Sequence, residues 1–126
     1  MNVVDLMATF VGGGTGAVCR YGIGRLLGGR YGGEFPLATF LINVSGCFLL
    51  GLLASLVAGA HQDMSLLTAL LATGFLGGYT TFSTYALEGV LLYNDGRRRL
   101  ATMSLIGSVG AGLLAAALGA GLAQAW

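Results

Sequence analysis

The residues best suited to chemistry lie in one run, Gly74 to Glu88, which reads Gly-Phe-Leu-Gly-Gly-Tyr-Thr-Thr-Phe-Ser-Thr-Tyr-Ala-Leu-Glu. The run gathers hydroxyls, glycines and aromatic rings inside an otherwise apolar stretch of the chain. In hydrocarbon, irregular backbone persists only where it is buried in protein or lines a water-filled path, because unpaired polar groups are costly there. The run therefore indicates transport of a solute across a membrane.

Helical spacing places these side chains on shared faces. Phe82 and Tyr85 are three residues apart and fall on one face, while Thr81, Thr84 and Glu88 fall on a neighbouring face. Aromatic rings present positive C–H edges to an anion, and hydroxyls donate hydrogen bonds. Such groups can replace the water around a small anion without a fixed charge that would trap it. They favour a small inorganic anion without choosing which one.

Polar side chains in two other apolar stretches add to this set. Asn43 is flanked by apolar residues, so its amide must either hydrogen-bond a partner helix or face a water path. Both interpretations remain open from the residue alone. Ser104 and Ser108 share a face of the last apolar stretch.

The composition places these groups in a membrane. Charged residues are only 9% of the 126 and hydrophobic residues are 56%, whereas a soluble domain carries roughly a quarter charged residues. We expect an all-α membrane protein that forms a single domain over 1–126. Its four transmembrane helices are predicted at about 3–27, 36–60, 65–93 and 100–125, each long enough to cross the bilayer. Four helices make a thin bundle, so enclosing a path implies an oligomer.

The third helix is the longest, and we expect it to be broken at midspan. Gly77-Gly78 is a flexible pair followed by Thr80 and Thr81, whose hydroxyls compete for backbone hydrogen bonds. This pattern predicts the break at the glycine pair. Elsewhere, small residues four apart predict close helix packing: Gly12 with Gly16, Gly74 with Gly78, and Ser104 with Ser108 and Gly112.

The connections between helices are short, which predicts antiparallel neighbours with both termini on one side. The arginines of the loops lie in the first and third connections: Arg25, Arg30, Arg97, Arg98 and Arg99. The second connection and both termini carry no arginine or lysine. The positive-inside rule therefore places the first and third loops in the cytoplasm.

Other classes of protein find little support. The glycines at 12–17 can be aligned with a dinucleotide fingerprint, but that pattern needs a βαβ unit and these lie in an apolar stretch. No cluster has metal-ligand spacing, and His61 stands alone in a loop. Cys19 and Cys47 are expected to be buried thiols. We expect no enzyme activity and no nucleic-acid partner.

The run from Gly74 to Tyr85, with Glu88 after it, resembles the third-span signature of the bacterial fluoride channels, the Fluc or CrcB family. The first span resembles the family's GGxxGAxxR pattern at Gly13, Gly16, Ala17 and Arg20, followed by Tyr21. The second resembles its run around an asparagine, at Pro36, Thr39, Asn43 and Gly46. The resemblance covers the whole chain.

This resemblance implies a passive, fluoride-selective channel of the bacterial plasma (inner) membrane that reduces fluoride toxicity by exporting fluoride. It implies a dual-topology dimer of two antiparallel subunits with two pores along their interface. The residues it assigns to the pore are Asn43, Phe82, Tyr85, Thr81, Ser83, Thr84 and Ser108. It places Arg20 at the aqueous vestibule and a structural sodium ion on the backbone carbonyls of Gly77 and Thr80.

The chain departs from the family pattern at Tyr85, where the family has a second phenylalanine, and at Ala38, where a glycine is usual. The loop arginines also favour one orientation, although a subunit of an inverted homodimer should be nearly balanced. We favour the homodimer as the simpler assembly, and a heterodimer with an inverted paralogue is the alternative.

Two other functions are less consistent with the sequence. A small proton-coupled drug or metabolite exporter also uses four spans and antiparallel dimers, but it needs a carboxylate deep in its first span. Here the first span has only Asp5, close to its start. A purely structural membrane subunit would explain the glycine stripes but not the midspan hydroxyls and rings.

Overall fold

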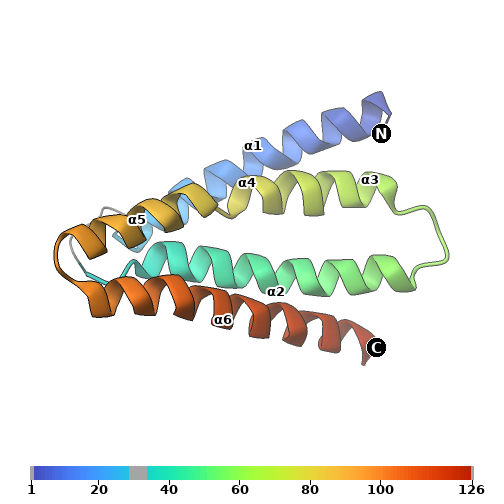
Figure 1. Cartoon of the computed structure of the whole chain (residues 1–126). Coiled ribbons are helices and arrows are strands. Elements are labelled where there is room, and N and C mark those ends of the chain that lie inside the picture. Colours follow the sequence, from blue (N-terminus) through green and yellow to red (C-terminus); the bar gives the residue numbers. More distant parts are fainter. Residues whose placement is uncertain (1, 29–33, 126) are drawn as a thin grey trace.

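The computed structural model describes residues 2–28 and 34–125, so Arg30 lies outside the described residues. Figure 1 shows four long helical segments: α1 (Val3–Leu26), α2 (Leu37–Gly59), a third spanning Ser65–Asn94, and α6 (Arg98–Gln124). Consecutive segments run in opposite directions, and both termini lie at the same end of the bundle (Figure 1). The described chain contains no strand. The expectations of an all-helical fold with short connections are confirmed.

The third segment is broken at midspan, as the sequence predicted. Its first half consists of α3 (Ser65–Leu67), the π-helix η1 (Thr68–Leu76) and α4 (Gly77–Tyr79), and its second half is α5 (Phe82–Asn94). Between them, Thr80 and Thr81 are extended, with ψ angles of 161° and 117°. The position of the break was predicted wrongly, because Gly77 and Gly78 remain helical and the chain unwinds at the threonine pair.

Hydrogen bonds explain why the helix stops at the threonines. The Thr80 hydroxyl donates to the Leu76 carbonyl at 2.9 Å and helps to end the first half. The Thr81 hydroxyl oxygen accepts from the Thr84 backbone N–H at 3.2 Å and caps the second half. A threonine in this position is a favourable N-cap, because it satisfies a donor that the helix leaves unpaired. The hydroxyls therefore set the break.

Glycines on α1 and on the first half of the third segment form a close interface. A Cβ on Gly12 or Gly16 would overlap carbonyl oxygens of the facing helix, and one on Gly78 would overlap the Gly13 carbonyl. The predicted close packing of small residues is thus confirmed here. Close packing also accounts for the glycine at position 78, because a side chain there would keep α1 from approaching. The helix break is not needed to explain this glycine.

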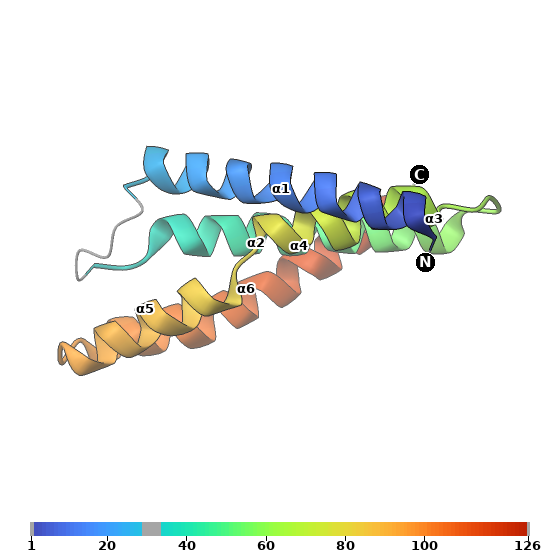
Figure 2. The same cartoon turned by 90° about the horizontal axis from the view of Figure 1, so that it is seen from above.

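The break lets the third segment exchange packing partners. Its first half packs on α1 through η1 and α4, whereas α5 packs on α6 and makes no contact with α1 among the described residues. Figure 2 shows α5 turning away from α1 and running alongside α6. The second large interface joins α2 to α6. The bundle therefore consists of two helix pairs, α1 with the first half of the third segment and α2 with α6. The third segment joins these pairs, because its second half packs on α6.

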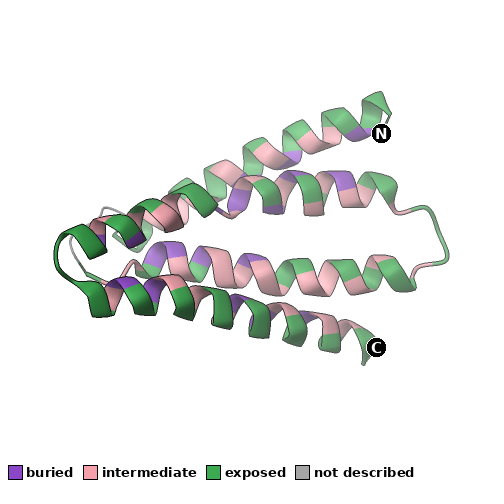
Figure 3. Ribbon diagram, viewed as in Figure 1, coloured by how far each residue is buried: buried purple, intermediate pink, exposed green. Residues whose placement is uncertain are grey.

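Three segments are long and apolar enough to cross a membrane: Leu37–Gly59, Ser65–Asn94 and Arg98–Gln124. Among the described residues, α1 does not reach the same standard of composition, although it has 24 residues. Buried residues follow the inner seams, and apolar side chains are exposed on the outer faces (Figure 3). Cys19 is one of these exposed residues and Cys47 is half-buried, so the expectation of a buried thiol was wrong for Cys19.

Candidate functional site

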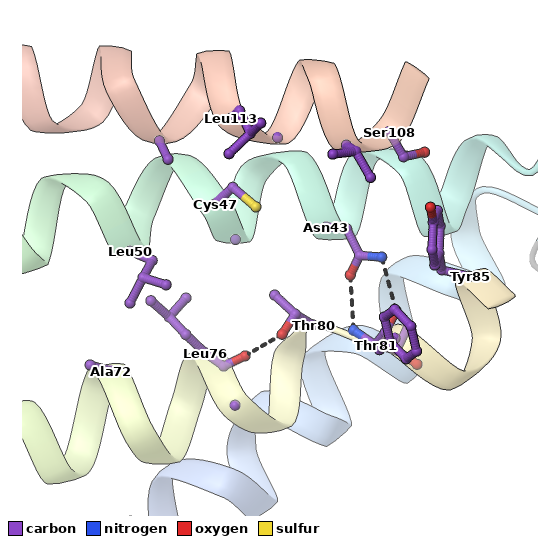
Figure 4. A pocket seen from close by; sticks show the side chains of 16 residues that line it. Asn43, Cys47, Leu50, Ala72, Leu76, Thr80, Thr81, Tyr85, Ser108 and Leu113 are labelled. Atoms are coloured by element: carbon purple, nitrogen blue, oxygen red, sulfur yellow. Dashed lines mark hydrogen bonds between the residues drawn. The ribbon is translucent and has the colours of Figure 1, made fainter. Parts of the chain in front are cut away.

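A groove of about 520 Å³ runs along α2, the broken segment and α6 (Figure 4). Most of its wall is apolar. The predicted site residues that line it are Asn43, Gly77, Thr80, Thr81, Phe82, Tyr85 and Ser108. The fold thus brings together residues from three segments at the level of the helix break. It places Arg20, Ser83 and Thr84 outside this groove.

Asn43 holds the backbone of the break. Its Nδ2 donates to the Thr81 carbonyl at 2.9 Å, and its Oδ1 accepts from the Thr81 N–H at 2.8 Å. The dashed lines that begin at Asn43 in Figure 4 mark this pair of bonds between α2 and the extended chain. The amide carries a second Nδ2 hydrogen that is free to face the groove. The Asn43 amide therefore hydrogen-bonds a neighbouring segment, as the first interpretation required. It also keeps one N–H donor for a water path, as the second interpretation required.

Two aromatic rings of α5, those of Phe82 and Tyr85, line the groove together with the Asn43 amide of α2. The ring centroids of Phe82 and Tyr85 are 5.7 Å apart, with the planes inclined by 45°. Phe82 is 79% exposed in the single chain. The ring stands at the edge of the groove, where a second molecule or lipid must cover it. The Tyr85 hydroxyl donates to the Leu105 carbonyl of α6 at 2.7 Å.

The α6 wall of the groove contains Ser108 and not Ser104. Ser108 is half-buried and lines the groove, whereas Ser104 is only 1% exposed and packs within the bundle. The resemblance assigned Ser108 to the pore, and in the structure Ser108 is the serine of this pair that reaches the groove.

The predicted hydroxyl track divides at the break. Thr81 is buried, and its hydroxyl also bonds the Thr84 hydroxyl at 2.9 Å. The Ser83 hydroxyl lies 3.4 Å from the Thr81 hydroxyl, but Ser83 is exposed and does not line the groove. Thr81 and Thr84 thus form a connected pair, with Ser83 at its outer side.

A second hollow of about 550 Å³ lies on the other side of Thr81. It is lined by Thr81 and Thr84 together with Arg20, Thr39 and Glu88. The Thr39 hydroxyl donates to Glu88 Oε1 at 3.0 Å, and Glu88 Oε2 is buried with no hydrogen-bond partner among the described residues. Arg20 donates from Nε to the Gly78 carbonyl at 3.0 Å, which leaves its terminal N–H groups available to this hollow.

Glu88 and Thr39 are polar lining residues that the sequence did not assign to the site. In the sequence, Glu88 stands at helical spacing from Thr81 and Thr84, and Thr39 belongs to the second-span run. What the sequence could not supply is the crossing of α2 with α5, which pairs residues 49 positions apart.

The break also releases two backbone carbonyls. In a continuous helix, Gly77 would accept from the Thr81 N–H and Thr80 from the Thr84 N–H. Here the Thr81 N–H donates to Asn43 and the Thr84 N–H donates to the Thr81 hydroxyl. Both carbonyl oxygens are therefore free of those bonds, and oxygen ligands suit a hard cation. The described residues contain no group of three His, Cys, Asp or Glu side chains that could hold a metal.

Comparison with known proteins gives a consistent result. Residues 7–120 match the family model described as CrcB-like protein, Camphor Resistance (CrcB). The chain is 46% identical over 126 residues to the Fluoride-specific ion channel FluC 2 of Brucella abortus biovar 1 (strain 9-941), covering 98% of both chains. It is 46% identical to FluC 2 of Yersinia pseudotuberculosis serotype I (strain IP32953), over 98% of this chain and 99% of that one.

A more distant relative is the Fluoride-specific ion channel FluC of Methylobacterium sp. (strain 4-46), at 42% identity over 92% of this chain and 93% of the relative. These relatives are named as channels and not as enzymes, and the comparisons give no support to the exporter alternative. The matched region contains the Asn43 amide, the helix break and both aromatic rings. The protein belongs to the CrcB-like family.

Proposed function

We propose that this chain is the subunit of a fluoride-selective ion channel, through which fluoride leaves the cytoplasm passively and its toxicity is reduced. The observation that carries the proposal is the groove at the break, where an amide donor and two aromatic rings meet and no described arginine or lysine lies in the wall. A small anion can exchange water for these donors and ring edges and still leave, because these side chains carry no positive charge that would hold it. The names of the relatives agree with this function.

In this proposal each predicted residue has a definite role. Asn43 donates its second Nδ2 hydrogen to the ion, Phe82 and Tyr85 offer ring edges, and Ser108 lines the opposite wall. Thr81, Ser83 and Thr84 form the hydroxyl track that leads from the groove. Arg20, on the second hollow, attracts anions at the vestibule.

We propose that two subunits assemble in inverted orientation in the bacterial inner membrane, with α1 as a fourth crossing. The exposed Phe82 ring and the open side of the groove support this arrangement, because a single chain cannot shield a polar path from lipid. The second subunit is a copy of this chain. Its groove-bearing face would cover that of the first.

We also propose a structural sodium ion held by the carbonyls of Gly77 and Thr80. Both oxygens have lost the helical hydrogen bonds that would otherwise occupy them, and they lie at the break. When bound, the ion would supply a fixed positive charge that holds the unwound backbone in place. Donors from two inverted chains would complete the oxygen shell.

The test is efflux from liposomes that contain only this purified chain, with fluoride and chloride followed separately and no proton gradient applied. Fast fluoride loss with chloride retained is the expected result. Equal loss of both anions, or transport that requires a proton gradient, would refute a passive fluoride-selective channel. Empty liposomes and liposomes with heat-denatured protein give the background rates.

A further inference from the structure

The Tyr85 hydroxyl joins α5 to α6. It donates to the Leu105 carbonyl at 2.7 Å, and Figure 4 shows it directed toward the helix that carries Ser108. A phenol has a single proton, so once this proton is donated the oxygen presents only lone pairs to its surroundings. The hydroxyl is therefore not a hydrogen-bond donor for an anion in the groove, although its ring remains in the wall.

Leu105 of α6 makes a second close contact with α5. A Cβ on Gly89 would overlap the Leu105 side chain, so the two helices approach closely there. Tyr85 and Gly89 are four residues apart and lie on one face of α5. The ring of Tyr85 is consequently fixed at both ends, by its own backbone on α5 and by its hydroxyl on α6. Phe82, at 5.7 Å, packs against a ring that cannot swing away.

We propose that Tyr85 is a positioning residue whose hydroxyl ties α5 to α6 and holds the aromatic pair at a fixed distance from Ser108. The tie makes the groove resist widening, and so it raises the discrimination against chloride, which is larger than fluoride. Selectivity of this kind requires that the wall does not yield to the larger ion. This inference rests on the proposed function, because it concerns the selectivity of that path.

The test compares the full-length wild type with Tyr85→Phe and with Tyr93→Phe, each purified and reconstituted into liposomes. Tyr93→Phe is the matched control, because Tyr93 is on the same helix, 55% exposed, with its ring against Arg98 at 5.1 Å. We expect Tyr85→Phe to conduct fluoride at least as fast as the wild type, while its fluoride-to-chloride ratio falls about fivefold. That factor corresponds to about 1 kcal/mol, the net contribution of one neutral hydrogen bond. Tyr93→Phe should match the wild type in its fluoride rate and in its fluoride-to-chloride ratio.

Two results would overturn the inference. An unchanged ratio in Tyr85→Phe would mean that the hydroxyl has no influence on selectivity. Loss of fluoride flux in a folded Tyr85→Phe would mean that the hydroxyl contacts the ion directly. If Tyr85→Phe does not assemble, the test uses a variant with 3-fluorotyrosine at position 85 instead. Its phenol is more acidic than that of tyrosine, so it donates a stronger hydrogen bond to the Leu105 carbonyl. The fluoride-to-chloride ratio of the fluorotyrosine variant should be at or above that of the wild type, and a lower ratio would contradict the proposed tie.

Melting temperatures of the same preparations separate this inference from the proposed function. Tyr85→Phe should melt below Tyr93→Phe, because only the first loses a bond between helices. If the wild type alone conducts no fluoride, the proposed homodimeric channel fails, while the difference in melting temperature still reports whether the tie exists. If the wild type conducts and the melting temperatures are equal, it is the tie that fails.

Discussion

Asn43 combines two functions that the sequence had presented as alternatives. Its carbonyl and one of its N–H bonds hold Thr81, and its other N–H remains for an ion. A side chain fixed by two hydrogen bonds has little freedom left to lose when an ion arrives. The amide is thus both a brace for the break and an oriented donor.

We expect Asn43→Asp to slow fluoride flux roughly a thousandfold. At about 4 Å, two negative charges repel by about 4 kcal/mol where the effective dielectric constant is 20. The carboxylate would also face the Thr81 carbonyl without a proton to donate. Efflux from liposomes measures the effect, and Asn94→Asp, at the exposed end of α5, is the control for the same chemical change. Normal flux in Asn43→Asp would remove Asn43 from the path.

We expect Phe82→Ile to reduce fluoride flux to the background of empty liposomes. Isoleucine keeps the apolar surface but removes the ring edge that an anion can approach. Phe10→Ile is a well-matched control, because Phe10 is 75% exposed on α1 and Phe82 is 79% exposed on α5. Size-exclusion chromatography should show unaltered assembly in both variants. A Phe82→Ile channel that conducts normally would assign the pore to another face.

The sequence predicted the site residues better than their contacts. The types and spacing of Phe82, Tyr85 and the threonines follow helical geometry within one segment, so they could be grouped from the sequence. The bond from Asn43 to Thr81 and that from Tyr85 to Leu105 join different segments. Such bonds depend on how helices cross, which no local pattern specifies.

At the scale of elements, the broken third segment is what assembles the site. Its first half is held by α1 and its second half by α6. An unbroken helix would continue along α1 and carry Phe82 and Tyr85 away from Ser108. The break therefore both frees backbone oxygens and brings the rings to the groove.

The predicted helix bounds agree with the structure because they depend on hydrophobic length. The first expected span, 3–27, compares with Val3–Leu26, and the third, 65–93, with Ser65–Asn94. The π-helical stretch and the position of the break were not predicted. The break is set by the Thr80 and Thr81 hydroxyls and by the two bonds between Asn43 and Thr81, and the glycine pair was attributed to flexibility when Gly78 in fact serves close packing.

We expect Gly78→Ala to destabilise the folded protein by about 1–3 kcal/mol, the usual effect of inserting a methyl group into a packed interface. The new Cβ would overlap the Gly13 carbonyl oxygen and push α1 away from α4. Gly14→Ala is the control, since a Cβ there meets nothing within 4 Å. In an open helical position alanine should if anything stabilise. Thermal unfolding in detergent distinguishes the two, and equal melting temperatures would contradict the proposed role of Gly78.

At the scale of the whole molecule, charge is distributed unevenly between the two ends. Four arginines lie where α1 ends and α6 begins: Arg25, Arg97, Arg98 and Arg99. Figure 1 shows these two helix ends at the same end of the bundle. The opposite end carries Asp63, where hydrogen bonds from Ser65 hold the pKa of the carboxyl below its usual value. That carboxyl is therefore ionised at neutral pH, and it adds to the asymmetry. Glu34 and Asp95, which lie in the described parts of the first and third connections, offset part of this charge at the same end.

An inverted homodimer requires that the same chain inserts both ways despite these arginines, and this can be measured directly. With Cys19 and Cys47 replaced by alanine, Gln62→Cys places a single thiol in the loop at the end without arginine. A membrane-impermeant maleimide applied to intact cells should label about half of the molecules, because each inverted dimer presents one such loop to each side. Asn94→Cys, at the arginine end, should be labelled to the complementary half. Complete labelling of one variant and none of the other would show a single orientation, as the positive-inside rule alone would give. The subunit would then need a second, oppositely charged chain to cover its Phe82 face, and liposomes with this chain alone would not conduct.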